Sequence, residues 1–304
     1  MGNAVYVVTG ANTGLGKEVS QILYSKNAKV YLAARSEEKA KDAIAAIQAA
    51  APDSKGDLVY LHLDLADLTT IKASANEFLS KEAKLHVLFN NAGVMTPPQG
   101  SKTAQGYEMQ LGTNNLGHFL FTKLLTPTLV TTAKTEPANT VRVVWVSSSA
   151  AELGSHNPGG VDMSNLDYHD DKGAILKYGI SKAGNFLQAT ELARRYGSDG
   201  VVSVALNPGN LGTDLSRHVG ILQMAVIKLL VHPPILGAYT ELFAAFSPEV
   251  TVDSVKKDNW VVPWGRFAPM REDIDAASRP TSEGGTGLAE KWWQWNEEQV
   301  KPYV

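Results

Sequence analysis

The 304-residue sequence contains no cysteine, which excludes a disulfide framework and any site built on thiolates. It also has no His-Glu-x-x-His pattern or comparable ligand spacing, so we expect no metal site. An excess of one charge is missing too, since 28 basic and 31 acidic side chains leave a formal net charge of −3. With no dense block of Lys and Arg, nucleic acid is not an expected partner. The lack of cysteine favours a reducing, cytoplasmic setting.

Uninterrupted apolar runs of membrane-spanning length are also lacking. The most apolar late stretch, residues 221–246, is broken by Lys228, His232, two prolines and Glu241. The chain enters an apolar run directly after Met1-Gly2-Asn3, without the basic lead of a signal peptide. We therefore expect an intracellular protein without a membrane span. Peripheral attachment through the late apolar stretch is the competing interpretation, although this stretch has no basic helix face.

The sequence does contain a hydrophobic fraction of 44%, ample for a core, and it alternates short apolar runs with longer helical patterns. The runs predict strands at residues 4–9, 29–34, 58–63, 85–90, 141–147, 201–207 and 260–262. Segments of helical length lie between them, at residues 14–26, 36–50, 67–80, 107–129 and 175–196. This order predicts a doubly wound α/β fold, a parallel sheet of about seven strands with helices on both faces. We expect one domain over residues 1–304, with a substrate lid and C-terminal extension at about 210–304.

The first predicted strand runs into a glycine-rich turn and then a helix. The turn reads Thr9-Gly10-Ala11-Asn12-Thr13-Gly14-Leu15-Gly16, with the spacing G-x-x-x-G-x-G. Glycines permit a tight turn and a close approach of the backbone to a diphosphate, while the helix N-terminus offers free N–H groups. An ordinary glycine-rich connection would need neither the strand before nor the helix after. We interpret the turn as a dinucleotide-phosphate site formed by Gly10, Asn12, Thr13, Gly14, Leu15 and Gly16.

The end of the second predicted strand indicates which dinucleotide is bound. NAD sites place an acidic residue there for the ribose 2′-OH, whereas NADP sites place an arginine nearby for the 2′-phosphate. This strand ends in Arg35-Ser36, with no acid at its end. Arg35 offers a charge-assisted fork to a phosphate and Ser36 a hydroxyl. The residues favour NADP over NAD; the alternative is a solvated Arg35 neutralised by Glu37 and Glu38.

A phenol and an ammonium group stand four residues apart at Tyr178 and Lys182. Both side chains leave one face of a helix, so they can reach the same cleft. A phenol titrates near about pH 10, and an adjacent cation lowers that pKa toward the range useful for proton transfer. Tyr-x-x-x-Lys alone is also a common surface pattern, so this pair gains meaning only with the other motifs.

Together the motifs resemble the short-chain dehydrogenase/reductase family, and in particular its retinol-dehydrogenase-like and fungal branches. The resemblance rests on the glycine turn, Asn90-Asn91-Ala92-Gly93, Thr113-Asn114-Asn115-Leu116-Gly117-His118-Phe119, Tyr178 to Lys182, and Asn207-Pro208-Gly209 followed by Thr213. It implies a Rossmann-type fold and a catalytic tetrad of Asn114, Ser148, Tyr178 and Lys182. In this family Tyr178 would exchange a proton with the substrate oxygen and Ser148 would hydrogen-bond that oxygen. Lys182 would hold the cofactor ribose and lower the pKa of the tyrosine, and Asn114 would position a water.

The same resemblance implies further cofactor contacts at the carboxyl ends of the strands. Asp64, with Leu65 beside it, would bind the adenine, and Asn91, Ala92 and Gly93 would pass near its ribose. Pro208, Gly209, Leu211 and Thr213 would border the nicotinamide. Ligands of open α/β sheets bind at this edge, which favours a shared site over a set of unrelated turns.

Several positions leave alternatives open. Ser147 is the runner-up to Ser148, because the thirty residues between Ser148 and Tyr178 exceed the usual family interval. Asn115 competes with Asn114, and the following Leu-Gly-His-Phe favours Asn114. We interpret His118 as a packed helix histidine, and Trp292 and Trp295 as anchors of a terminal helix.

The function that the resemblance implies is NADP-dependent interconversion of a ketone or aldehyde with an alcohol, on a small to medium apolar substrate. Carbonyl reductase, ketoreductase and alcohol dehydrogenase describe this activity. The alternatives are a catalytically silent NADP-binding regulator and an epimerase or dehydratase of the same family. Members of the family commonly form dimers or tetramers, so a homo-oligomer is compatible with the sequence.

Overall fold

The computed structural model describes the chain except for residues 1–3, 213–230 and 258. Its centre is one sheet in which the strands lie in the order β3-β2-β1-β4-β5-β6-β7-β8. Neighbouring strands are parallel, apart from the antiparallel pair β7 and β8. The strands are β1 (Val5–Thr9), β2 (Lys29–Ala34), β3 (Asp57–His62), β4 (Val87–Asn90), β5 (Arg142–Val146), β6 (Val202–Leu206), β7 (Trp260–Val262) and β8 (Arg266–Phe267).

The doubly wound α/β fold is confirmed, but the described residues contribute eight strands to the sheet where the sequence predicted about seven. The missed strand, β8, contains two residues and returns directly beside β7. Two residues are too short for any alternation of apolar and polar side chains, which is the signal that reveals a strand in a sequence. The sheet is therefore mostly, and not wholly, parallel.

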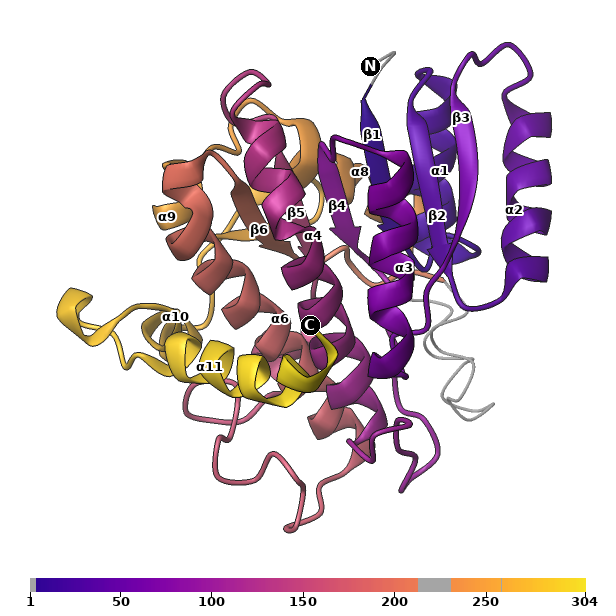
Figure 1. Cartoon of the computed structure of the whole chain (residues 1–304). Helices are drawn as coiled ribbons and strands as arrows, with labels where there is room; N and C mark the ends of the chain where they lie inside the picture. The colour runs from indigo at the N-terminus through magenta and orange to yellow at the C-terminus, as the bar shows by residue number, and fades with distance from the viewer. Residues whose placement is uncertain (1–3, 213–230, 258) are drawn as a thin grey trace.

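Helices cover both faces of the sheet (Figure 1). One face carries α3 (Leu68–Lys81), α4 (His118–Ala133) and α6 (Ala174–Tyr196), with α11 (Leu288–Val300) lying across α6. The other face carries α1 (Gly14–Ser25), α2 (Glu37–Ala50) and α8 (Pro234–Phe246). The shorter helices are α5 (Ala150–Leu153), α9 (Ser254–Lys257) and α10 (Glu272–Ser278). Because both faces are covered, every residue of β1, β5 and β6 is buried.

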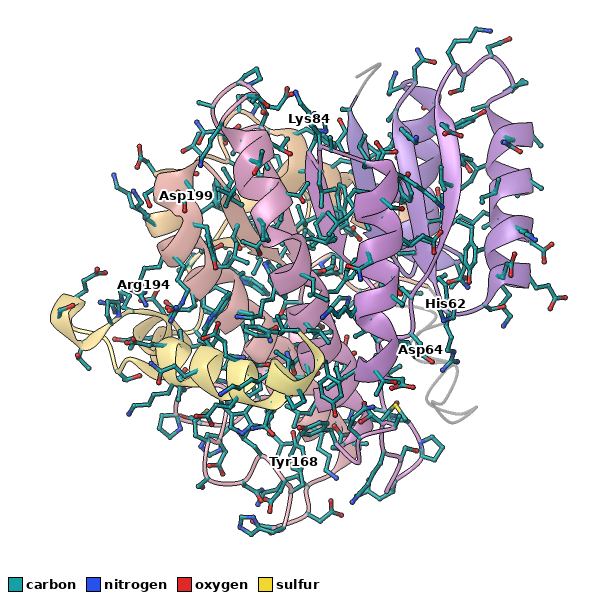
Figure 2. The ribbon with its side chains drawn as sticks, viewed as in Figure 1. His62, Asp64, Lys84, Tyr168, Arg194 and Asp199 are labelled. Carbon is teal, nitrogen blue, oxygen red and sulfur yellow. The ribbon has the colours of Figure 1, made fainter. Side chains whose placement is uncertain are left out.

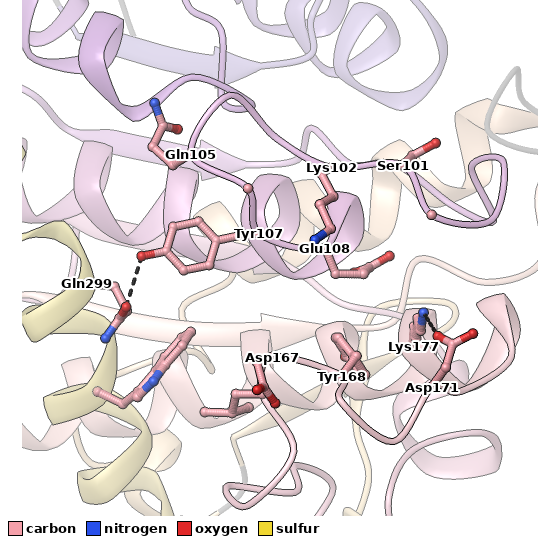
Figure 3. A pocket seen from close by; sticks show the side chains of 14 residues that line it. Ser101, Lys102, Gln105, Tyr107, Glu108, Asp167, Tyr168, Asp171, Lys177 and Gln299 are labelled. Carbon is pink, nitrogen blue, oxygen red and sulfur yellow. Dashed lines mark hydrogen bonds and ion pairs between the residues drawn. The ribbon is translucent and has the colours of Figure 1, made fainter.

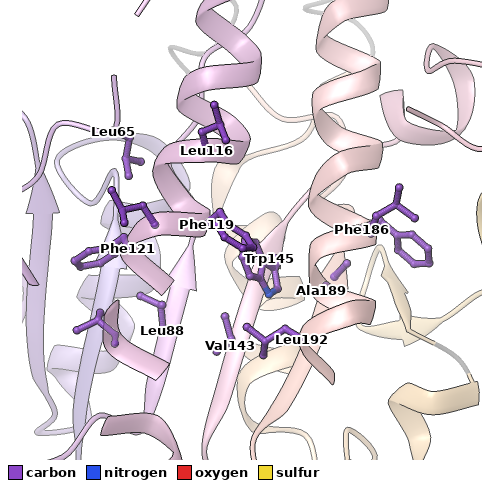
Figure 4. Close-up of a cluster of buried hydrophobic side chains, with 14 of the residues drawn as sticks. Leu65, Leu88, Leu116, Phe119, Phe121, Val143, Trp145, Phe186, Ala189 and Leu192 are labelled. Carbon is purple, nitrogen blue, oxygen red and sulfur yellow. The ribbon is translucent and has the colours of Figure 1, made fainter. Parts of the chain in front are cut away.

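The larger of two buried apolar clusters lies between the sheet and the α3, α4 and α6 layer. Figure 4 shows Trp145 of β5 at its centre, between Phe119 of α4 and Leu192 of α6. The cluster extends to α11, where Trp292 is fully buried and its Nε1 donates to the Gly184 carbonyl at 3.1 Å. Trp295 stacks on Trp292 with 5.1 Å between ring centroids. The interpretation of these tryptophans as helix anchors is confirmed.

The segment before α4 differs from the continuous helix predicted at 107–129. Leu111–Gly117 forms a π-helical segment that leads into α4 at His118. Gly117 permits close packing here, since a Cβ at this position would lie 2.4 Å from the Leu65 carbonyl oxygen. Such wide turns change the direction of side chains and often lie at functional sites. This one carries Asn114.

The predicted lid falls partly outside the described residues, which omit 213–230 and with them Thr213. The residues that follow form α8, which packs against α1, β5 and β6. Of the helices that the structure describes, none combines the length and the apolar character needed to cross a membrane.

Candidate active site

The turns after β1 and β4 pack against each other because these strands are neighbours in the sheet. Gly10 and Gly14 adopt positive φ values of 69° and 54°, a conformation that favours glycine. The Asn91 side chain donates to the Thr9 carbonyl at 2.7 Å. A Cβ on Gly16 would lie 2.6 Å from the Asn91 Nδ2 atom, so only glycine allows the two turns to come this close. The glycine turn and the Asn91–Ala92–Gly93 turn thus form one surface at the N-terminus of α1.

The predicted adenosine contacts lie at the ends of β2 and β3. Arg35 is exposed, and none of the described residues forms an ion pair with it; Glu37 pairs with Lys41. Ser36 caps α2 by accepting from the Lys39 amide at 3.4 Å, so its hydroxyl already has a structural role. Figure 2 shows Asp64 beside His62 at this edge.

The two residues predicted to meet the adenine base, Asp64 and Leu65, also have contacts within the chain. Asp64 Oδ1 accepts from the Ala66 amide at 2.9 Å. The side chain of Leu65 is buried in the core and packs under Gly117. A ligand would therefore meet Leu65 through its backbone.

The turn after β6 and the glycine turn both lie close to Gly237 of α8. A Cβ on Gly237 would lie 2.2 Å from Leu211 Cδ1, 3.1 Å from Leu15 Cδ2 and 3.3 Å from the Pro208 carbonyl oxygen. Gly209 has a φ of 96°, and its amide donates to Asn207 Oδ1 at 2.9 Å. Three of the predicted cofactor contacts, Leu15, Pro208 and Leu211, are therefore brought together; Thr213 lies outside the described residues.

Tyr178 lies in α6 with its side chain buried, and its hydroxyl interacts with the Ser148 hydroxyl. Burial raises the pKa of Tyr178 to about 12, and the hydrogen bond with Ser148 acts in the opposite direction. The sequence led us to expect a lowered pKa for this phenol. The pKa is raised instead, because desolvation of the phenolate outweighs the contacts that stabilise it within the chain.

The hydroxyl groups of Ser147 and Ser148 make different contacts, because successive side chains of an extended chain point in opposite directions. The Ser147 hydroxyl donates to the Lys182 carbonyl at 2.7 Å and is buried. The Ser148 hydroxyl interacts with Tyr178 and also accepts from the Ala150 amide at 3.2 Å. Of the two candidate serines, the structure brings Ser148 to the phenol.

Lys182 follows Tyr178 by one helical turn, and its Nζ lies 5.7 Å from the centroid of the Tyr178 ring. The Nζ donates to the Val146 carbonyl at 2.8 Å. Burial lowers the pKa of Lys182 to about 8, while the negative charge of Glu241 acts to raise it. The ammonium is therefore held at the end of β5 in a desolvated environment.

Asn114 is fully buried, and its side chain joins three segments. Its Nδ2 donates to the Val94 carbonyl at 3.0 Å and to Ser181 Oγ at 2.9 Å, and its Oδ1 accepts from the Val94 amide at 2.8 Å. A Cβ on Gly93 would lie 3.4 Å from Asn114 Oδ1 and 3.5 Å from Lys182 Nζ. Asn114 thus fixes the loop after β4 against α6, and its Oδ1 has a second lone pair that could accept another hydrogen bond.

His118 matches the interpretation as a packed histidine. Its ring is buried, with Nε2 3.1 Å from Thr9 Oγ1 and Nδ1 3.2 Å from the Asn114 carbonyl oxygen. Burial lowers the pKa of His118 to about 3, so the imidazole is neutral at physiological pH.

Two cavities flank this region. A cavity of about 310 Å³ is lined by residues of the turns after β5, β6 and β7, including Ser149, Gly209 and Trp264. A larger cavity of about 510 Å³ lies between the loop around Tyr107, the loop around Tyr168, and α11 (Figure 3). The tetrad residues line neither cavity; the lining of the smaller one includes Ser149, which follows Ser148 in the chain.

Residues that the sequence did not single out also contribute. Ser181 and Asn185 of α6 hold Asn114, the first through its hydroxyl and the second by donating to the Asn114 carbonyl at 2.7 Å. Glu241 of α8 is fully buried, and burial raises the pKa of its carboxyl group to about 8. Glu241 appears in the sequence only as an interruption of an apolar stretch, so no motif could reveal it.

Known proteins resemble this chain along nearly its whole length. Residues 4–159 match the short chain dehydrogenase family. The chain is 63% identical over 303 residues to a short-chain dehydrogenase/reductase of Phomopsis amygdali, which covers 99% of this chain and 90% of that protein. It is 52% identical over 302 residues to the short-chain dehydrogenase/reductase pkfC of Emericella nidulans, with 99% and 93% covered.

Solved structures share the fold. An uncharacterized protein from Mycobacterium paratuberculosis superimposes with a TM-score of 0.69 at 28% identity, over 98% of this chain and 93% of that chain. Pseudomonas aeruginosa RhlG, solved as an active-site complex with NADP, gives a TM-score of 0.65 at 22% identity, over 86% and 95%.

The sheet order, the glycine turn and the buried Tyr178–Lys182 pair define a dinucleotide-binding α/β protein of the oxidoreductase class. The chain belongs to the short-chain dehydrogenase/reductase family. The family resemblance read from the motifs, including its fungal branch, is confirmed.

Proposed function

We propose that the protein is an NADP-dependent oxidoreductase that interconverts a ketone or aldehyde with the corresponding alcohol. The observation that carries the proposal is the contact between the buried Tyr178 phenol and the Ser148 hydroxyl, with the Lys182 ammonium one helical turn away. Two hydroxyls that converge on one point can hold a carbonyl oxygen, and one of them can exchange a proton with it.

The described residues fit a dinucleotide cofactor. The glycine turn and Asn91–Gly93 pack so closely that a side chain at Gly16 would not fit. The surface that they form lies at the N-terminus of α1, where free N–H groups favour a diphosphate. Arg35 supports NADP, because it is exposed at the end of β2 and has no ion-pair partner among the described residues. When bound, the nicotinamide would supply or accept the hydride.

Each tetrad residue has a distinct role in this proposal. Tyr178 donates the proton to the substrate oxygen during reduction and removes it during oxidation. Ser148 donates a hydrogen bond to the same oxygen and stabilises the charge that develops there. Lys182 places a positive charge next to the phenol, and this charge favours the phenolate when the proton leaves. Asn114 holds the loop after β4 in place and offers its remaining Oδ1 lone pair to a water near Lys182.

The substrate would enter the cavity of about 310 Å³ beside Ser149 and Trp264. Trp264 is 44% exposed, and its ring meets that of His232 edge to face with 5.0 Å between centroids. This aromatic wall and the modest volume suit a small to medium apolar carbonyl compound.

The test is NADPH oxidation by the purified protein across a panel of aryl ketones and aliphatic aldehydes, with identification of the alcohol products. Carbonyl-dependent oxidation is expected, and Tyr178→Phe should lower kcat by about 10²- to 10⁴-fold. The affinity for NADPH should remain nearly unchanged, because the substitution keeps the ring. Tight NADPH binding without turnover across the panel would instead indicate a silent regulator, and a product without net redox change would indicate an epimerase or dehydratase.

A further inference from the structure

Five buried amide side chains form a continuous hydrogen-bonded network between α11, α6 and the π-helical segment Leu111–Gly117. We call it the amide network, and its members are Asn114, Asn115, Asn185, Gln188 and Asn296. None of them is more than 3% exposed. Burying an amide costs stability unless it is hydrogen-bonded, and a bonded network rigidifies the elements that it joins. The amide network therefore fixes these three elements relative to one another.

The amide network begins on α11 at Asn296. Its Nδ2 donates to the Trp292 carbonyl at 2.7 Å, and its Oδ1 accepts from Gln188 Nε2 at 3.1 Å. A Cβ on Gly184 of α6 would lie 2.8 Å from Asn115 Nδ2 and 3.0 Å from Trp292 Cζ2. Glycine at this position of α6 therefore lets α11 and the π-helical segment approach each other closely.

At its other end the amide network binds the backbone of the π-helical segment. Asn185 Nδ2 donates to the Asn114 carbonyl at 2.7 Å, and Gln188 Nε2 donates to the Asn115 carbonyl at 3.4 Å. The same Asn185 Nδ2 also donates to Gln188 Oε1 at 3.4 Å. In the opposite direction, Asn115 Nδ2 donates to the Ser181 carbonyl of α6 at 2.8 Å. Side chains of α6 thus hold two carbonyls in the middle of the wide turn, and Gln188 connects them to α11.

The π-helical segment connects the amide network to the candidate active site. Asn114 Nδ2 donates to Ser181 Oγ at 2.9 Å, and this hydroxyl donates to the Tyr178 carbonyl at 2.8 Å. The direction of the Asn114 side chain depends on the backbone turn beneath it, since a wide helical turn redirects the side chains that it carries. Three hydrogen bonds, through Gln188 and Asn185, separate Asn296 from the backbone of that turn.

We propose that Asn296 is a positioning residue for the candidate active site. Through Gln188 it holds the π-helical turn in the conformation that directs Asn114 toward Val94 and Ser181. The C-terminal helix then serves turnover and not only the stability of α6. This inference rests on the proposed function, since the direction of Asn114 matters for turnover only if Tyr178 transfers a proton.

The first test separates kcat from KM in the NADPH-dependent reduction of an aryl ketone such as acetophenone. Asn296→Leu replaces the amide with an apolar side chain of similar size, so Gln188 loses its partner on α11. A small displacement of a group at the reaction centre is costly, so kcat should fall by about tenfold. The KM for NADPH should stay within about twofold of the wild-type value, because the predicted phosphate contacts lie on the glycine turn and at the end of β2.

Val300→Ala is the matched control, because it removes buried apolar contacts at the end of the same helix and leaves the amides in place. It should lower the melting temperature and leave kcat unchanged. Asn296→Ala removes the amide without adding bulk and should lower kcat as Asn296→Leu does, so the test stands even if leucine does not fit. An unchanged kcat in both Asn296 variants, or an equal fall in Val300→Ala, would overturn the proposal.

The second test asks whether Asn296 acts through Gln188. Gln188→Met removes the next member of the amide network and should also lower kcat. The double variant Asn296→Leu/Gln188→Met should have a kcat no lower than that of Gln188→Met alone, because residues that act along one path are not additive. A double variant in which the two losses multiply would mean independent effects and would overturn the proposal.

The third test does not depend on activity. Hydrogen–deuterium exchange reports local opening of the backbone, so peptides that cover residues 111–117 should exchange faster in Asn296→Leu than in the wild type. The same peptides should keep the wild-type rate in Val300→Ala. Unchanged exchange in Asn296→Leu would overturn the proposal. Faster exchange in a protein that reduces no carbonyl would overturn the proposed function and retain the link between α11 and the π-helical segment.

Discussion

Two adjacent serines at the end of β5 make different contacts, and substitution of each separates catalysis from stability. Ser148 meets the Tyr178 hydroxyl, so Ser148→Ala should lower kcat by about 10²-fold while the melting temperature stays close to that of the wild type. Ser147 donates to the Lys182 carbonyl, so Ser147→Ala should lower the free energy of unfolding by about 1 kcal/mol. Steady-state kinetics and urea unfolding measure both. The reverse pattern would assign the catalytic role to Ser147.

Arg35 gives a separate prediction about the cofactor. A charge-assisted hydrogen bond to a phosphate is worth about 1.5–3 kcal/mol, so Arg35→Gln should lower the preference for NADPH over NADH by about 10- to 100-fold. The measurement is kcat/KM with each cofactor at one carbonyl concentration. Lys39→Gln, an exposed cation on the first turn of α2, is the matched control and should keep the preference. An unchanged ratio in Arg35→Gln would argue against 2′-phosphate recognition at this position.

The sequence predicted single residues where a motif fixes their chemistry, and failed where burial decides it. Tyr178, Lys182 and Ser148 could be placed together because helical spacing and the strand end put them at one edge. The direction of the pKa shift of Tyr178 could not be predicted, since it depends on how much water the surrounding chain excludes.

The contact between α5 and α6 depends on the absence of a side chain. A Cβ on Gly179 would lie 2.0 Å from the Gly154 carbonyl oxygen and 2.8 Å from that of Ala150. Gly179→Ala should therefore force α5 away from α6 and lower the free energy of unfolding by about 1–3 kcal/mol. It should also lower kcat, because α5 directly follows Ser148 and Ser149.

Gly173→Ala is the control at the start of the same helix. A Cβ there meets no atom within 4 Å, and the φ of −62° suits alanine, so stability should change by less than about 0.5 kcal/mol. Urea unfolding compares the two variants. Equal stability of Gly179→Ala and the wild type would contradict the close packing of α5 on α6.

Strands and helices were predictable to the extent that their side chains repeat. The strand at Trp260–Val262 and the strand at Lys29–Ala34 have the predicted bounds, because fully buried strands read as apolar runs between polar turns. The two-residue strand β8 and the π-helical Leu111–Gly117 segment were missed. The first is too short to show a period, and the second depends on close packing of Gly117 against Leu65 rather than on local sequence.

His118 links the packing of the whole molecule to pH. The pKa of this imidazole falls from 6.5 to about 3 on folding because the ring is buried between Thr9 and Asn114. A base with a depressed pKa in the folded state stabilises the protein fully above its unfolded pKa and loses that contribution as the pH falls. Between pH 7 and 5 the loss should be about 2 kcal/mol.

The free energy of unfolding in urea at pH 7 and pH 5 measures this loss. His118→Gln has no titrating group at this position. Over the same pH interval its free energy of unfolding should therefore fall by about 2 kcal/mol less than that of the wild type. Parallel falls in the two proteins would contradict the buried neutral imidazole.

The most direct measurement is a crystal structure of the protein with NADP⁺ bound. The account predicts that the diphosphate rests on the turn from Gly10 to Gly16, the 2′-phosphate meets Arg35, and the nicotinamide ring faces the hydroxyl of Tyr178. A Tyr178 hydroxyl turned toward solvent, or a nicotinamide bound away from it, would contradict the proposed chemistry.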